Sequence, residues 1–209
     1  MKVYLTAHKK TFNYQLSTLQ QKKMKDKLLK IASFGIKPDT SPEIAEQTKL
    51  VNMTSLLGVP ISIIYVILFS FTGAYHLAIA FTVGFFVFLF PPFLNKWFGL
   101  DIGRYFIFIM VGVVFGTVNI IAGKEAGFYL GFLVISVPPI FCYPDFRRGI
   151  LFVSVILLFL ILSIIGNIMI EPTCPLDYAM AIYLFNLFIV FVTSITVIVI
   201  FKTELKKSR

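Results

Sequence analysis

Charged residues are scarce in this sequence, and long stretches lack them altogether. Asp, Glu, Lys and Arg make up 14% of the 209 residues, whereas soluble globular domains carry about 25%. The uncharged stretches cover residues 50–95, 105–123, 126–144, 149–170 and 178–201. This distribution excludes an ordinary soluble domain and indicates a polytopic membrane protein.

Residue types that carry enzymatic or metal chemistry are also scarce. The sequence has two cysteines, Cys142 and Cys174, and two histidines, His8 and His76, and their spacing matches no metal site. It contains no HExxH motif, phosphate-binding loop, GxSxG motif or kinase motif. No charged residue lies within an apolar stretch, which argues against a proton relay. We therefore expect neither an enzyme nor a bound cofactor.

The uncharged stretches predict an all-α membrane protein with six transmembrane helices. A helix needs about 20 apolar residues to cross the hydrocarbon core, so the last four stretches supply one span each. The first stretch is long enough for two spans and is expected to turn back at residues 71–74, which contain Gly73. The predicted spans are residues 50–71, 75–94, 105–123, 126–143, 149–170 and 178–201.

The basic residues fall almost entirely on one side of this arrangement. Residues 1–49 hold ten lysines, and only Lys124 lies in one of the three connections on the other side. The positive-inside rule makes the basic side cytoplasmic, while five or seven spans would scatter the charges over both sides. The net charge of +9 therefore reflects topology, and we expect no nucleic-acid partner.

This topology predicts a multi-pass protein of the inner cell membrane, with residues 1–41 and 202–209 in the cytoplasm. Cys174 is expected outside and Cys142 near the inner surface, too far apart to form a disulfide. The lysine-rich residues 1–31 fit either a solvated arm or a helix lying on anionic lipid.

Local signals also predict where helices begin and approach one another. Ser41, Pro42 and Glu43 predict the start of one helix that enters the first span, and Pro60 is expected to kink it. The pairs Pro91-Pro92 and Pro138-Pro139 are expected to mark the inner ends of spans two and four. Glycines four residues apart predict close packing of spans three and four, with homodimerisation as the alternative; these helix-packing residues are Gly112, Gly116, Gly127 and Gly131.

Hydrogen-bonding side chains gather in the predicted outer half of the spans. They are Tyr65, His76, Asn119, Lys124, Glu125, Tyr129, Asn167 and Asn186. One interpretation is interhelical hydrogen bonding with an aromatic belt, which is common in membrane proteins. The other is an outward-opening pocket for a small or amphipathic ligand.

From about Lys30 onward, the sequence resembles the six-span membrane modules of bacterial receptor histidine kinases and membrane-anchored class III adenylate cyclases. The resembling features are residues 31–36 before the first span, the entry at 49–52, the turn at 123–127, and a last span that runs into the charged segment 202–207. The resemblance implies a sensory role and a cytoplasmic output domain. Because this sequence ends at Arg209, the output would lie in a missing domain or a partner protein.

The sequence therefore favours a non-enzymatic sensory or regulatory receptor module that takes part in signal transduction. It would sit in the lipid bilayer and pass a ligand or membrane signal to the cytoplasm through the last span. A small permease or channel subunit is the alternative, for which a polar stripe along the full depth of one helix would be expected. An assembly protein without a ligand remains a third reading.

Overall fold

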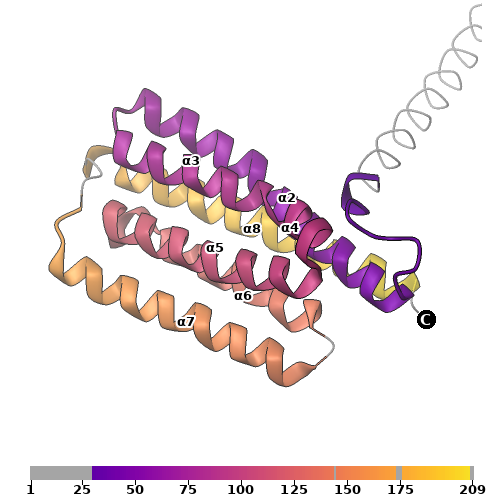
Figure 1. Ribbon diagram of the computed structural model, residues 1–209. Helices are drawn as coiled ribbons and strands as arrows, with labels where there is room; N and C mark the ends of the chain where they lie inside the picture. The colour runs from indigo at the N-terminus through magenta and orange to yellow at the C-terminus, as the bar shows by residue number, and fades with distance from the viewer. Residues whose placement is uncertain (1–29, 144, 173–175, 208–209) are drawn as a thin grey trace, which may run out of the picture.

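The computed structural model describes residues 30–143, 145–172 and 176–207, and these residues form helices and no strand. The elements are α2 (Pro42–Phe71), α3 (Tyr75–Leu89), α4 (Pro91–Phe98), α5 (Leu100–Ala122), η1 (Lys124–Ala126), η2 (Phe128–Leu130), α6 (Gly131–Cys142), α7 (Phe146–Met169) and α8 (Leu176–Lys207). The helices lie side by side along one direction (Figure 1). The predictions for residues 1–29 and for Cys174 lie outside the described residues.

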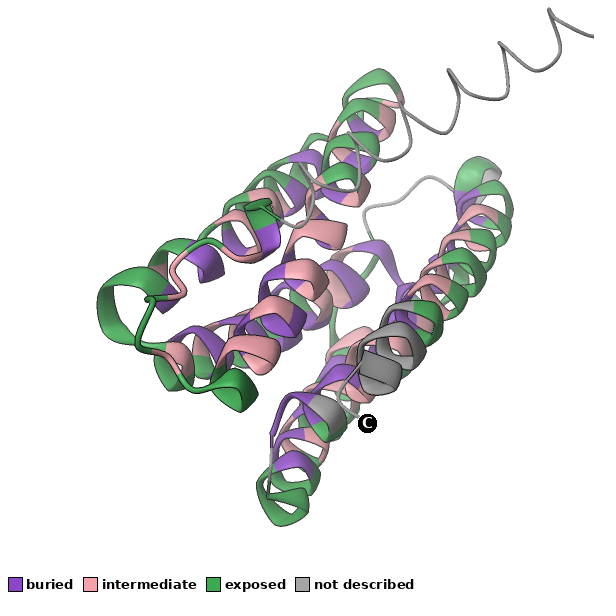
Figure 2. Ribbon diagram, turned by 90° about the vertical axis from the view of Figure 1, so that its right-hand side faces the viewer, coloured by how far each residue is buried: buried purple, intermediate pink, exposed green. Residues whose placement is uncertain are grey.

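The bundle has two distinct ends. Helix α2 begins, and α8 finishes, at the end marked C in Figure 1. Four basic residues lie at this same end, which we call the basic end: Lys96 in the last turn of α4, Arg104 near the start of α5, and Arg147 and Arg148 in the first turn of α7. The burial pattern in Figure 2 places many exposed residues on the outer helices, and the large exposed apolar side chains are mostly Ile, Leu, Phe and Val. Such an outer surface suits contact with lipid.

Helix α2 forms as its sequence predicts. The Ser41 hydroxyl accepts a hydrogen bond from the Ile44 amide at 3.4 Å, and Pro42 occupies the first helical position. The helix continues through Pro60 to Phe71. The turn that follows uses Gly73 at φ +78°, a conformation that glycine adopts without a steric penalty. The predicted turn at 71–74 is confirmed.

The fourth predicted span, residues 126–143, is not one continuous helix. The chain makes two 3₁₀ turns, η1 and η2, before the 12-residue helix α6. Gly123 and Gly127 have φ of +78° and +74°, so the backbone cannot stay α-helical there. The described residues therefore contain five helices that are long and apolar enough to span a membrane, not six.

The first proline pair lies where α3 ends and α4 begins, as expected for the inner end of span two, whereas the second pair lies inside α6 and does not end it. Pro91 and Pro92 begin α4, where the missing amides cost little because first-turn amides have no partner within the helix. Phe90, between α3 and α4, also has helical dihedral angles. Pro138 and Pro139 lie inside α6, which continues to Cys142.

The glycines predicted to join spans three and four have other neighbours. A Cβ atom added at Gly112 would lie 2.6 Å from the Phe159 ring of α7, and one at Gly116 would lie 3.8 Å from the Phe159 carbonyl. Gly127 faces Tyr183 of α8, and only Gly131 brings the fourth stretch against α5, at Phe115. The GxxxG pair of α5 therefore packs against α7, because the broken start of the fourth stretch offers no straight helix to it.

Two alanine substitutions should distinguish the effect of close packing on stability from the effect of helix propensity. Gly112→Ala should lower the free energy of unfolding by about 1–3 kcal/mol, because the Phe159 ring must shift. Gly116→Ala meets only ordinary contact distances and should be neutral or stabilising, since alanine favours a helix by about 1 kcal/mol. Thermal unfolding in detergent measures both. Equal melting temperatures would contradict the assigned contact with α7.

Candidate functional site

A cavity of about 100 Å³ lies between α2, α3, α5, η2, α6 and α8, and we call it the central cavity. Most of its lining is aliphatic or aromatic. The polar side chains on its wall are Thr54, Ser62, Tyr65, Asn186 and Thr193. Along α2 the lining runs from Thr54 to Tyr65, which is about 16 Å of helix at 1.5 Å per residue. The cavity is therefore elongated, apolar and roughly parallel to the helices.

Tyr65 and Asn186 close the end of the cavity that is distant from the basic end. The Tyr65 hydroxyl donates a hydrogen bond to Asn186 Oδ1, and Asn186 Nδ2 donates to the Ala126 carbonyl. Both side chains are buried. The ring of Phe81 stacks on Tyr65 with centroids 4.4 Å apart. These two hydrogen bonds join α2, α8 and η1 at a single point.

Three hydroxyl groups on the cavity wall are unpaired. Ser62 is 1% exposed, and neither it nor Thr54 or Thr193 forms a hydrogen bond within the described part of the chain. By contrast, the hydroxyls of Thr48 and Thr82 bond to carbonyls four residues earlier. Thr54 and Thr193 are half-buried, and all three hydroxyls face the cavity, so they can form hydrogen bonds with a bound molecule.

The predicted outer polar residues divide into three groups. Only Tyr65 and Asn186 line the cavity. Asn119 and Asn167 join α5 to α7: Asn119 Nδ2 donates to Ser163 Oγ at 3.0 Å, and Asn167 Oδ1, with its amide oriented to suit its neighbours, accepts from Asn119 Nδ2 at 3.1 Å. The remaining predicted residues lie away from the cavity wall; His76, Lys124 and Glu125 are exposed and Tyr129 is half-buried.

A second polar cluster, at the basic end, escaped the sequence analysis. Asn52 of α2 is fully buried, and its Nδ2 donates to the carbonyls of Ala32 at 2.8 Å and Phe34 at 2.9 Å. Its Oδ1 accepts from Asn95 Nδ2 of α4 at 2.7 Å. The two asparagines thus fasten the turn that precedes α2 to the bundle. Both lie in the uncharged stretch 50–95, and their polarity within that stretch was the available signal.

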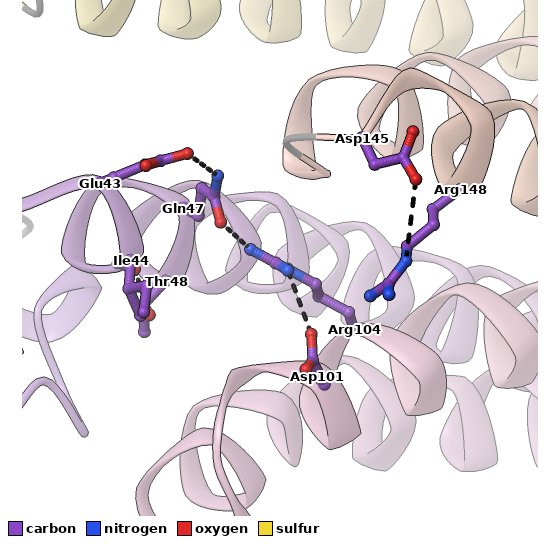
Figure 3. Close-up of polar contacts among 8 residues, drawn as sticks. All are labelled: Glu43, Ile44, Gln47, Thr48, Asp101, Arg104, Asp145 and Arg148. Atoms are coloured by element: carbon purple, nitrogen blue, oxygen red, sulfur yellow. Dashed lines mark hydrogen bonds and ion pairs between the residues drawn. The ribbon is translucent and has the colours of Figure 1, made fainter. Parts of the chain in front are cut away.

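Arg104 is also buried, although its position suggested a solvated connection. It lies in the first turns of α5 and is 4% exposed. Its guanidinium donates to Asp101 Oδ1 at 3.2 Å and to the Gln47 Oε1 of α2, and it lies 5.0 Å from the Tyr143 ring centroid. Figure 3 shows Arg104 between α2 and α5. The residue therefore links three parts of the chain.

The two aspartates in Figure 3, Asp101 and Asp145, offer a matched test of this burial. Asp101→Asn removes the charged partner of buried Arg104 and should cost about 1–2 kcal/mol, less than for a fully buried pair because Asp101 is itself 62% exposed. Asp145→Asn affects an ion pair of 4.0 Å whose members are both exposed, and should cost less than about 0.5 kcal/mol. Unfolding in detergent provides the comparison, and equal effects would contradict the buried role of Arg104.

Comparisons with known protein families, with curated proteins and with solved structures find no match for this chain. Among the described residues there is no group of three or more His, Cys, Asp or Glu side chains that could hold a metal ion.

Proposed function

We propose that this chain is a non-enzymatic membrane sensor, and that the central cavity receives a small apolar or amphipathic ligand. The observation that carries the proposal is that α8 both lines the central cavity and extends to the basic end. This helix contributes Asn186, Thr193 and Val197 to the cavity wall, and it continues without interruption to Lys207 at the basic end. One rigid element therefore connects the cavity with the end of the bundle where the charges gather.

The size of the cavity favours a response to binding. Sites for drug-sized ligands have volumes of about 300–1,000 Å³, whereas the central cavity has about 100 Å³. A ligand of that size must displace a wall. Among the long helices that line the cavity, α8 has the smallest share of buried residues: 17% of its 18-residue apolar segment is buried, against 50% in α5. Binding would then move α8 about its fixed contact at Asn186.

The proposal includes six crossings of the membrane, with both termini in the cytoplasm. Helix α6 spans about 18 Å, less than the hydrocarbon thickness of about 30 Å, and η1 and η2 would complete its path. The grouping of the arginines at the basic end supports this topology.

Topology can be tested with single cysteines in a chain that carries Cys174→Ser. Lys124→Cys should react with a membrane-impermeant thiol reagent in intact cells, because Lys124 is exposed at the end opposite to the arginines. Arg148→Cys, also exposed, should react only after the cells are opened. Cys142 is buried and can stay in place. The reverse labelling pattern would invert the proposed orientation.

Ligand binding can be tested with tryptophan fluorescence and a brominated decanol as the probe. In a Trp97→Phe background, Phe88→Trp places the reporter on the cavity wall, and Phe86→Trp places it on the exposed face of the same helix. Quenching should saturate at position 88 and rise linearly with membrane-dissolved probe at position 86. Linear quenching at both positions would exclude a binding cavity.

The permease or channel alternative has less support from the cavity wall. A conducting path would require polar groups along its full depth, whereas Thr54 and Ser62 are separated by the apolar side chains of Leu57 and Ile61 on the same wall. Phe81, Phe88 and Phe108 complete much of the surface. Such a lining suits an apolar chain better than a hydrated solute.

A further inference from the structure

A second and larger recess lies at the basic end, outside the central cavity. It has a volume of about 470 Å³ and is formed by the turn before α2 together with α2, α3 and α4. Its lining is apolar except for Lys30, and includes Ile31, Phe34, Leu89 and Phe93. We call it the basal groove. Its volume falls within the range of about 300–1,000 Å³ that is typical of ligand sites.

We propose that the basal groove binds one anionic phospholipid from the leaflet that faces the basic end. The apolar floor would hold an acyl chain, and two lysines would contact the phosphate. Lys30 lines the groove. Lys96 Nζ lies 5.1 Å from the centroid of the Phe34 ring, which forms the adjacent wall. Neither lysine forms an ion pair with an acidic side chain in the described part of the chain, so both charges are available.

The depth of the groove matches the boundary between headgroups and acyl chains. Leu89 belongs to the uncharged stretch 50–95, while Lys96 immediately follows that stretch. Trp97 is 63% exposed and lies 5.9 Å from Phe93 between ring centroids. Tryptophan is enriched at this boundary in membrane proteins. The floor of the groove therefore lies at the depth of acyl chains, and its lysines lie at the depth of phosphates.

The same turn is held by the buried asparagines, which gives lipid binding a structural consequence. Asn52 fixes the carbonyls of Ala32 and Phe34, and the Phe34 ring packs edge-on against Phe93 at 5.4 Å. A lipid in the groove would add contacts to the outer side of Ile31 and Phe34, which are 49% and 36% exposed. Bound lipid should therefore slow hydrogen exchange of the amides in residues 34–36.

The test uses the full chain in nanodiscs of neutral phosphatidylcholine, with phosphatidylglycerol added as the anionic probe. Native mass spectrometry should show one retained phosphatidylglycerol, and the variant Lys30→Gln/Lys96→Gln should weaken its retention about twenty-fivefold, since each lysine near anionic lipid contributes about fivefold. Lys124→Gln, at the opposite end, should leave retention unchanged. Leu89→Trp, which fills the groove but keeps both lysines, should also expel the lipid.

Several outcomes would overturn the proposal. Equal retention of neutral and anionic lipid would remove the role of the lysines. Unchanged retention in Leu89→Trp would place the lipid elsewhere on the surface. Equal protection of residues 34–36 by inorganic phosphate alone would show that an anion suffices without an acyl chain. These results are independent of the central cavity, because none of these substitutions touches its lining.

Discussion

Replacing Asn52 with alanine should lower the free energy of unfolding by about 3–5 kcal/mol. The substitution leaves the Ala32 and Phe34 carbonyls and the Asn95 amide without their partner, and each buried unpaired group costs about 1–3 kcal/mol. Asn52→Asp should be equally damaging, because a carboxylate cannot donate to the two carbonyls. Denaturant unfolding in detergent micelles measures the loss.

Two controls separate this effect from general weakening of the bundle. Ser154→Ala removes an exposed hydroxyl bonded to the Ile150 carbonyl and should change stability by less than about 0.5 kcal/mol. Gly112→Ala weakens the distant contact between α5 and α7. Only Asn52→Ala should accelerate hydrogen exchange at the amides of Phe34 and Ile36, which bond within the fastened turn. The same acceleration in Gly112→Ala would disprove a local role for Asn52.

The elements that could be predicted from sequence depend on local signals. The start of α2 follows from Ser41 and Pro42, and its end from Gly73. No Gly or Pro follows Leu176, and α8 continues as far as Lys207. Each signal acts through the backbone of its own neighbourhood, so no tertiary contact was needed to interpret it.

The two 3₁₀ turns that interrupt the fourth predicted span could not be predicted, because the glycines at and before its start are compatible with two structures. Two glycines four residues apart allow helices to approach closely. Glycine also allows the positive φ that Gly123 and Gly127 adopt here. The sequence alone does not distinguish these uses. Tertiary contacts accompany the second one here, since Asn186 of α8 bonds to the Ala126 carbonyl between the two glycines.

The candidate site was predictable only in part, for a related reason. The polarity of Tyr65 and Asn186 identified them as notable, yet polarity gave no means to separate them from Asn119 and Asn167. Their roles depend on neighbours that are distant in sequence: 121 residues separate Tyr65 from Asn186. Arg104 was missed because a charge next to an apolar stretch is usually solvated, whereas its partner Gln47 lies 57 residues away.

Filling the central cavity should move the basic end of α8 and leave its opposite end in place. Spin labels at Ile198→Cys and Arg148→Cys, in a chain with Cys174→Ser, report the distance between α8 and α7 at the basic end; both native side chains are exposed. Saturating 1-decanol should shift this distance by about 2 Å, the scale of helix movements in switching proteins. Pulsed electron resonance measures the distance.

The fixed end of α8 provides the matching control. Labels at Tyr178→Cys and Ile168→Cys, which are exposed positions at the opposite end, should keep their separation when decanol is added. Asn186→Leu removes the hydrogen bonds to Tyr65 and Ala126, so in that variant decanol should also broaden the distances at this end. Asn119→Leu should lower stability without altering either pair of distances, because Asn119 lies between α5 and α7.

If the distance at the basic end stays constant while the quenching at position 88 saturates, the cavity binds without transmitting a signal, and the sensor proposal fails.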